Sequence, residues 1–311
     1  MSDKFRVAIV GLGRISVQYD LDSPHGDSIY THARAISRHP DCMLVGGVDV
    51  SAEARARFIQ HYKASGFERY EDLVRVSGAP DLVVLATPAL VRLSAIKEII
   101  AQPPGLLLIE KPLANTLDEA DQLLEICQNA GIKVAVNYIR RFDPVLSRIP
   151  ALAVKAGLGN PVACSILYSG DILESGSHYI DLLVSWFGSG RVRQTWGKGS
   201  GQIDFGDVKG VLQSVRTSFG IGEIDLLFAD GRMAITDYGE KLTIWKNGPD
   251  PNFPGYQRLG QMVNAPQPEM RFYQKNVLDR LLAEWKIGVH TVSTGADARE
   301  SLRLSLELTG S

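Results

Sequence analysis

The sequence is poor in cysteine, and the three cysteines among its 311 residues lie far apart. Cys42, Cys127 and Cys164 have apolar neighbours, and none belongs to a CxxC pair or a Cys/His ligand set. This spacing excludes the dense disulfide framework of a small secreted protein and gives no sign of a zinc site. We expect three buried thiols in a reducing compartment.

Long hydrophobic runs are also missing. No apolar stretch approaches the roughly 18 residues that a membrane-spanning helix needs. The apolar run 7–10 near the N-terminus is interrupted by glycine, so it does not form the hydrophobic segment of a signal peptide. These absences predict a cytoplasmic protein with no membrane partner.

An excess of charge of either sign is missing as well. The chain has 33 basic and 35 acidic residues, a formal net charge of −2. It therefore lacks a basic footprint for nucleic acid and a long-range attraction to anionic membranes. With 45% hydrophobic and 22% charged residues the composition is that of an ordinary globular protein, and the length indicates two domains.

In the first half of the chain, short runs rich in Val, Leu and Ile alternate with helical stretches. The runs are apolar on both faces, which is typical of parallel strands covered by helices. The expected strands are 6–10, 43–49, 82–86, 106–110 and 133–137, and the expected helices are 31–38, 52–61, 89–101 and 117–129. Thr87, before Pro88, and Thr116 are the expected N-caps of the last two helices. Residues 1–137 are therefore predicted to form an α/β, Rossmann-type domain with a doubly wound parallel sheet, which binds dinucleotides.

After a helix near residues 144–158 the pattern changes. The runs typical of antiparallel strands are 162–169, 211–218, 223–228, 232–237 and 241–245. Asp230-Gly231 is a strong hairpin signal. Segment 247–268 has several Gly, Pro and Asn residues and no clear period, so a long loop is expected. With helices near 269–285 and 296–308, residues 138–311 are predicted to form an α+β domain with a mainly antiparallel sheet.

The most informative motif is Gly11-Leu12-Gly13-Arg14-Ile15-Ser16, which directly follows the first expected strand. Gly11 permits a tight turn, and Gly13 has no Cβ to block the approach of phosphate groups. Such a turn between a strand and a helix brings a dinucleotide pyrophosphate to the helix N-terminus. Ser16 replaces the third glycine of the fingerprint, so the prediction depends on the position of the motif at the start of a β/α alternation.

Asp49 ends the second expected strand. An acidic residue at this place accepts hydrogen bonds from the adenosine ribose hydroxyls and repels a 2′-phosphate. It lies farther from the glycine turn than the motif expects, which fits an insertion at residues 17–28. A surface acid at a strand end is the alternative, but the position favours NAD(H) over NADP(H) as the cofactor.

Glu110-Lys111-Pro112 follows the fourth expected strand, at the edge where open α/β sheets bind their ligands. Pro112 restricts the backbone before it and so fixes the direction of Lys111. A lysine at this place can donate to a substrate hydroxyl and promote its deprotonation. From these residues alone, a solvated loop lysine is an equal alternative.

The segment from Glu174 to Asp181 holds a third group of polar side chains. Core spacing on a helix is shown by Ile180, Leu183, Val184 and Phe187. His178 and Asp181 fall on the opposite side, and Glu174 joins them if the helix extends back to it. His178 is therefore a candidate to exchange a proton with a substrate alcohol beside a carboxylate, and a surface histidine is the alternative. No convincing metal-ligand set is present in the sequence.

In order and spacing, these motifs resemble the glucose–fructose oxidoreductase / inositol dehydrogenase / MocA family over nearly the whole chain. The matching segments are 11–15, His32, 86–88, 110–114, 137–144, 176–183 and 294–302. The resemblance implies a Rossmann domain joined to an α/β domain with an open sheet, which binds substrate and often mediates homodimer or homotetramer formation. It implies nicotinamide-dependent oxidation or reduction of a hydroxyl group of a sugar, cyclitol or sugar nucleotide.

By this resemblance Lys111 and His178 match the catalytic lysine and histidine of the family, and the bond from Lys111 to Pro112 is expected to be cis. The expected cofactor-binding residues are Gly11, Gly13, Arg14, Ile15, Asp49, Thr87, Pro88, Glu110 and Lys111. The expected substrate-binding residues are Tyr138, Arg141 and Asp181. Glu174 stands where the family usually has Asp, so it keeps the charge of a catalytic or orienting carboxylate but reaches one methylene farther.

Three functions follow as hypotheses. The first is an NAD(H)-dependent dehydrogenase or reductase of a carbohydrate-type secondary alcohol. The second is redox-assisted cleavage of a glycosidic bond with tightly held NAD. The third is a cofactor-binding regulator without catalysis, against which the presence of both Lys111 and His178 argues, since a sensor needs neither.

Overall fold

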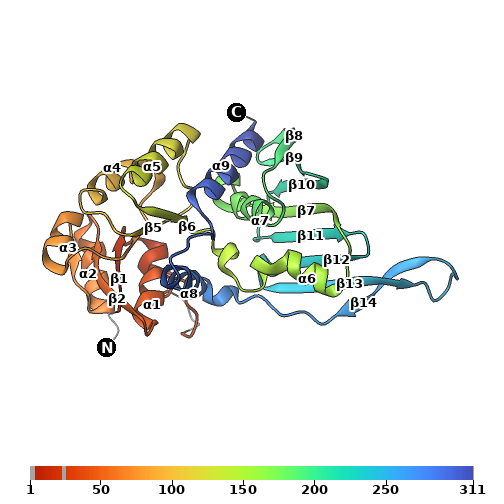
Figure 1. Cartoon of the computed structure of the whole chain (residues 1–311), viewed down its shortest axis with the longest axis horizontal. Coiled ribbons are helices and arrows are strands. Elements are labelled where there is room, and N and C mark those ends of the chain that lie inside the picture. The colour runs from red at the N-terminus through yellow and green to blue at the C-terminus, as the bar shows by residue number, and fades with distance from the viewer. Residues whose placement is uncertain (1–3, 23–25, 311) are drawn as a thin grey trace. The chain divides into compact units, whose positions relative to one another are not determined.

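The computed structural model describes residues 4–22 and 26–310, and for Gln261 the backbone alone. The chain divides into two compact units (Figure 1). The first unit combines Met1–Ile139 with Arg271–Arg299, and the second combines Arg140–Met270 with Glu300–Ser311. Residues 23–25, within the insertion expected at 17–28, lie outside the described residues.

The first unit contains a six-stranded sheet in the order β3-β2-β1-β4-β5-β6. All of its strand pairs are parallel. The strands are β1 (Phe5–Val10), β2 (Cys42–Val48), β3 (Gly66–Phe67), β4 (Leu82–Leu85), β5 (Leu106–Ile109) and β6 (Lys133–Val136). This strand order is that of the doubly wound dinucleotide-binding fold, which confirms the predicted fold class.

Burial explains why the strands of this sheet could be predicted from the sequence. Every residue of β4 and of β5 is buried, so both strands form unbroken apolar runs. The helices of the unit are α1 (His32–Arg38), α2 (Ala52–Tyr62), α3 (Tyr70–Ser77), α4 (Ala89–Ile99), α5 (Leu117–Asn129) and α8 (Tyr273–Lys286). Thr116 caps α5 as expected, because its side chain accepts a hydrogen bond from the Glu119 N–H. The two-residue β3 and the helix α3 were not predicted.

The second unit contains an eight-stranded sheet in the order β14-β13-β12-β11-β7-β10-β9-β8. Its strands are β7 (Pro161–Ser169), β8 (Arg191–Gly197), β9 (Ser200–Phe205), β10 (Val208–Val215), β11 (Gly222–Phe228), β12 (Gly231–Thr236), β13 (Lys241–Pro249) and β14 (Gln257–Val263). Only β7 and β10 pair in parallel among these described strands, so the sheet is mainly antiparallel as predicted. Asp230-Gly231 lies at the β11–β12 hairpin, also as predicted.

One prediction about this sheet is wrong, and two of its strands were not predicted. The segment 247–268 is not a long loop, because β13 continues to Pro249 and pairs with β14. The hairpin of β13 and β14 runs beyond the other strands (Figure 1), and the Phe253 and Tyr256 side chains near its tip are exposed. Strands β8 and β9 were not expected either. Most described side chains of β8 and of β14 are exposed, so neither strand shows the apolar alternation from which a strand is recognised.

The helices of the second unit also differ in detail from the expectation. The helix expected at 144–158 is a 3₁₀ turn (Leu146–Arg148) followed by α6 (Ile149–Ala156). The unit also holds α7 (Ser177–Phe187), and α9 (Gly295–Thr309) begins in the first unit and ends in the second.

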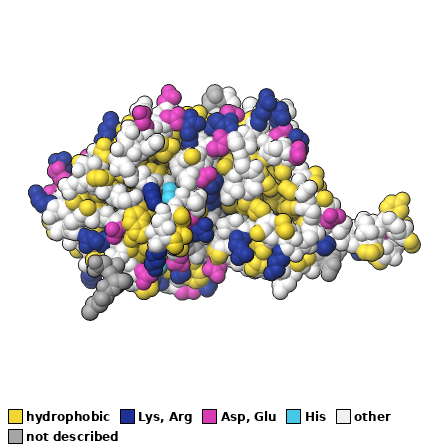
Figure 2. All heavy atoms as spheres, in the orientation of Figure 1, with side chains coloured by type: hydrophobic (Ala, Val, Ile, Leu, Met, Phe, Trp, Pro, Cys, Tyr) yellow, Lys and Arg dark blue, Asp and Glu magenta, His cyan; other side chains and the backbone are white. Residues whose placement is uncertain are grey.

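Side-chain burial and surface charge complete the description of the chain. All three cysteines are buried and unbridged, as predicted. Among the described residues, no helix is long and apolar enough to cross a membrane. Basic and acidic side chains are interspersed on the face drawn in Figure 2.

Candidate functional site

The glycine turn follows β1 directly, and its two glycines have different reasons to be glycine. Gly11 has φ +94°, and a Cβ there would lie 2.8 Å from the carbonyl carbon and oxygen of Ala86. The fold itself therefore requires Gly11. Gly13 has φ −77°, and a Cβ there would meet nothing within 4 Å. The packing of the chain leaves open space at Gly13, as expected where a phosphate group approaches the backbone.

The segment directly after the turn is not yet the first helix of the sheet, which begins where it was expected. Arg14–Gln18 forms a single π-helical turn of 5 residues, and α1 begins only at His32. The Ser16 hydroxyl donates to the Gly11 carbonyl oxygen at 2.6 Å, so the residue that replaces the third glycine closes the turn. Arg14 is exposed and Ile15 is half-buried.

Asp49 lies at the glycine turn, as predicted from its place after β2. Its Oδ2 accepts a hydrogen bond from the Leu12 N–H at 2.8 Å, and its Oδ1 accepts one from the Ser51 N–H at 2.8 Å. A carboxylate has about four lone-pair sites, so both oxygens keep one site for a ribose hydroxyl. The negative charge is thus fixed beside the turn by two main-chain bonds.

A basic side chain near Asp49 was missed by sequence reasoning. The Arg55 guanidinium donates to the carbonyl oxygens of Asp49 at 2.7 Å and Val50 at 3.0 Å. It also lies 3.5 Å from the Glu68 carboxylate. An arginine near this position accommodates the 2′-phosphate of NADP in some Rossmann folds. Two positions for a charged side chain, one acidic and one basic, therefore lie together after β2.

Thr87 follows β4, and its expected role as an N-cap is wrong. Helix α4 begins at Ala89, so Pro88 takes the N-cap position, and no side chain caps the helix. Proline offers no side-chain acceptor, and Thr87 stands one residue too early to reach the free N–H groups. The Thr87 hydroxyl is buried and has no hydrogen-bond partner among the residues that the structure describes. A buried hydroxyl of this kind, beside the open glycine turn, fits a site that binds a polar ligand.

Glu110 follows β5 and is held by two side chains that come from distant segments. Its Oε1 accepts hydrogen bonds from His32 Nε2 at 2.7 Å and from Asn137 Nδ2 at 2.6 Å. The other Asn137 N–H reaches Gln274 Oε1 at 3.3 Å. Burial opposes ionisation of Glu110, but these hydrogen bonds and the nearby charge of Lys111 outweigh it and hold the pKa of the carboxyl below its ordinary value. Glu110 is thus an ionised anchor directly before Lys111.

Lys111 is half-buried, and its peptide bond to Pro112 is cis, as the resemblance implied. It lies after β5, at the same carboxyl edge of the parallel sheet as the glycine turn after β1 and Asp49 after β2. Open α/β sheets bind their ligands at this edge. The first unit therefore places Lys111 at the edge where a cofactor binds. Tyr138, which lies after β6, is fully buried.

In the second unit, Glu174 and His178 share one continuous helical segment. A π-helical turn (Ile172–Gly176) leads directly into α7, so helical geometry does extend back to Glu174. The Asp171 side chain caps this turn by accepting from the Leu173 N–H at 2.7 Å. Glu174 is exposed and His178 is half-buried. Both side chains are therefore accessible from solvent on this unit.

Asp181 was expected on the polar side of the same helix, but it is fully buried. Its Oδ2 accepts from Arg141 Nε at 2.8 Å, and its Oδ1 accepts from the Ser301 hydroxyl at 3.2 Å. Arg141 is itself 6% exposed. Helical periodicity separates two faces, but it does not show that other polar groups cover the second one. The substrate-binding roles of Arg141, Asp181 and Tyr138 stay predictions.

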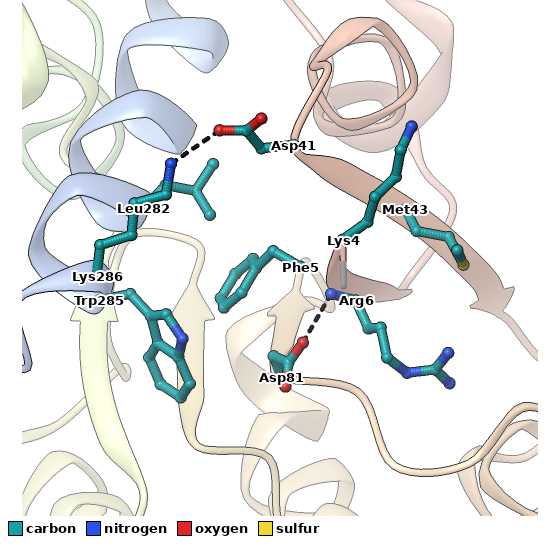
Figure 3. Close-up of a pocket in the computed structure, with 9 residues that line it drawn as sticks. All are labelled: Lys4, Phe5, Arg6, Asp41, Met43, Asp81, Leu282, Trp285 and Lys286. Atoms are coloured by element: carbon teal, nitrogen blue, oxygen red, sulfur yellow. Dashed lines mark hydrogen bonds and ion pairs between the residues drawn. The ribbon is translucent and has the colours of Figure 1, made fainter. Parts of the chain in front are cut away.

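A cavity of about 790 Å³ lies elsewhere in the first unit (Figure 3). Its lining includes Phe5, which starts β1, and Asp81, which precedes β4, so it lies at the amino edge of the sheet. Lys286 Nζ binds Asp41 at 2.8 Å, and the Arg6 N–H donates to Asp81 at 2.8 Å. The cavity contains none of the predicted site residues. No group of three or more His, Cys, Asp and Glu in the described part of the chain is arranged to hold a metal ion.

Comparison with known proteins finds a matching family model and a matching relative. Residues 5–138 match the family model described as an oxidoreductase family with an NAD-binding Rossmann fold. The uncharacterized oxidoreductase YrbE of Bacillus subtilis (strain 168) is 23% identical over 253 residues, which are 76% of this chain and 67% of YrbE.

Two solved structures share the fold over the whole chain. An oxidoreductase of Desulfitobacterium hafniense, assigned as NADPH-dependent, has a TM-score of 0.82 at 17% identity and covers 100% of this chain and 96% of its own. The WlbA dehydrogenase of Bordetella pertussis, in complex with NADH and UDP-GlcNAcA, has a TM-score of 0.75 at 16% identity with the same coverage.

Proposed function

We propose that the chain is an NAD(H)-dependent dehydrogenase or reductase, on the premise that its residues 5–138 match the model of the oxidoreductase family with an NAD-binding Rossmann fold. Its substrate in this proposal is a secondary alcohol, or the corresponding ketone, of a sugar, cyclitol or sugar nucleotide. The observation that carries the proposal is the Asp49 carboxylate, which two main-chain bonds fix beside a glycine turn with open space at Gly13.

The first unit supplies the residues that would hold the cofactor. The turn that the pyrophosphate approaches is formed by Gly11, Gly13, Arg14 and Ile15. The Asp49 carboxylate accepts hydrogen bonds from the ribose hydroxyls. Thr87 and Pro88 lie against the same turn, because the backbone of Ala86 and Thr87 packs on Gly11. Glu110 and Lys111 follow the adjacent strand. When bound, the nicotinamide would supply the acceptor or donor of a hydride.

Lys111 and His178 are the groups proposed to move the proton. Oxidation of a secondary alcohol releases one hydride and one proton, so the hydroxyl needs a base within hydrogen-bond reach. In this proposal Lys111 polarises the hydroxyl, and His178 accepts its proton and returns it to solvent. Glu174, one helical turn before His178, orients or polarises the imidazole. Tyr138, Arg141 and Asp181 shape the substrate side of the site.

The substrate class is supported by the relatives and by the charge of the chain. The WlbA structure holds a sugar nucleotide beside NADH. The net charge of −2 creates no strong long-range field that would favour an anionic macromolecule.

The first test is titration of cofactor-free protein with NADH and with NADPH, followed by fluorescence. Binding with a preference for NADH is expected, and absence of binding would contradict the proposal. Turnover is then screened with sugars and sugar nucleotides for the wild type, Lys111→Ala and His178→Ala. Both variants should lose most of their kcat while retaining cofactor binding, and unchanged turnover would remove these residues from the mechanism.

A further inference from the structure

Arg92 is a buried arginine on α4 that binds two separate backbone segments of the first unit. Its Nη1 donates to the carbonyl oxygens of Pro112 and of Leu113, the latter at 3.0 Å. Its Nη2 donates to the Thr87 carbonyl oxygen at 2.8 Å. One guanidinium therefore links the segment after β4 to the segment after β5.

The burial of this charge is not explained by packing. Arg92 is 2% exposed, and each of its described hydrogen bonds goes to a neutral main-chain carbonyl. Burial lowers the pKa of its guanidinium to about 10, although the nearby Glu110 partly offsets this effect. An apolar side chain of similar length would fill the same space without the desolvation cost of a charge. What such a side chain lacks is the planar set of donors that holds three carbonyls at once.

We propose that Arg92 is a positioning residue for Lys111. The segment on one side of Lys111 is fixed because His32 and Asn137 hold the Glu110 carboxylate. The segment on the other side is fixed because Arg92 holds the Pro112 and Leu113 carbonyls. Lys111 thus projects from a backbone that is anchored before and after it. The same guanidinium ties this segment to Thr87, so Lys111 keeps a constant place relative to the loop that packs on the glycine turn.

This inference rests on the proposed function, because it assumes that Lys111 acts on the substrate. Misplacement of a reacting group by about 1 Å costs on the order of 100-fold in rate. Loss of the Arg92 anchor should therefore lower kcat by a larger factor than it weakens cofactor binding, because Arg92 has no described contact with the glycine turn or with the Asp49 carboxylate.

The experiment compares Arg92→Met, Arg92→Lys and the wild type, with Arg57→Met as a matched control. Arg57 lies on α2 in the same unit and pairs with the exposed Glu53, so its loss changes one charge without touching either segment. The first readout is hydrogen–deuterium exchange of residues 86–91 and 110–116. Arg92→Met should accelerate exchange in both segments but not in the glycine turn, and Arg57→Met should change neither segment.

The second readout is steady-state kinetics. Arg92→Met should lower kcat by about 10- to 100-fold and raise KM for NADH by a clearly smaller factor. Arg92→Lys should recover part of the loss in kcat because its ammonium can still donate to these carbonyls. Unchanged exchange, or faster exchange with unchanged kcat, would overturn the proposal. A rise in KM for NADH as large as the fall in kcat would also overturn it, since the defect would then be general. If Arg92→Met does not fold, exchange and kinetics are measured on Arg92→Lys, and these two measurements decide whether the proposal holds. If the wild type turns over no substrate, the proposed function fails, and the exchange data alone decide whether Arg92 is the anchor.

Discussion

Asp49→Asn is expected to shift the cofactor preference from NADH toward NADPH. Both oxygens of Asp49 already accept one main-chain N–H, which leaves two of about four lone-pair sites for ribose hydroxyls. A hydrogen bond to a charged group contributes about 1.5–3 kcal/mol, so the loss of one such bond weakens NADH binding by roughly 10- to 100-fold. Removal of the carboxylate charge also removes its repulsion of a 2′-phosphate, which is about 4 kcal/mol at 4 Å near a protein surface.

The assay is fluorescence titration of cofactor-free protein with both nucleotides at low and high salt. The ratio of the two dissociation constants should move by at least about tenfold toward NADPH in Asp49→Asn. In the wild type, salt should weaken the discrimination, because ions screen the repulsion. Glu53→Gln is the control, since it removes one exposed negative charge from the neighbouring helix α2 without touching the turn. A ratio that is the same in both variants would refute the role of Asp49.

Three further predictions concern the turn, the buried ion pair and Glu110. Gly13→Ala should weaken NADH binding with little change in melting temperature. Gly11→Ala should instead destabilise the fold, because of these two glycines Gly11 alone has a positive φ and a close backbone neighbour. Equal changes in the melting temperatures of the two variants would contradict this distinction. Asp181→Ala should lower the free energy of unfolding by about 3–5 kcal/mol in urea titrations, since it removes the buried carboxylate that pairs with the Arg141 guanidinium. A loss of less than about 1 kcal/mol would mean that the pair is not buried in solution. The pKa of Glu110 is lower in the folded protein than in the unfolded chain. The Glu110 carboxylate therefore stabilises the fold at pH values above the pKa of the unfolded chain, and this contribution is lost as the pH falls through the lower pKa of the folded protein. The stability difference between wild type and Glu110→Gln should therefore shrink on acidification below about pH 4.5, and a difference that is constant with pH would show that the carboxylate is not the source.

The sequence predicted those parts of the molecule in which a local pattern has a single structural meaning. The buried strands β4 and β5 are continuous apolar runs, and Asp49 and Lys111 follow strand ends, where a parallel sheet always places its ligands. Strand β14 has no such pattern, because its described side chains are mostly exposed and its pairing with β13 comes from the main chain.

The features that were missed depend on contacts between distant segments. The Glu110 anchor joins His32 and Asn137, which are 78 and 27 residues away in sequence. Arg92 reaches carbonyls 20 and 21 residues farther along the chain. The spacing of residues along the chain does not indicate that such distant side chains contact one another. The burial of Asp181 was missed for the same reason, since its partners Arg141 and Ser301 lie on other elements.

The discontinuity of the first unit has a consequence for the synthesis of the protein. Residues 271–299 return to this unit, where the Trp285 ring packs against Phe5 at 5.2 Å and the Ser293 hydroxyl donates to the Val136 carbonyl at 2.6 Å. The ribosome must make residues 140–270, which are most of the second unit, before it supplies these contacts, a delay of roughly ten seconds at usual rates. The first unit is therefore begun first but is completed only after most of the second unit has been made, and a fragment that ends at residue 139 exposes the surface that α8 normally covers.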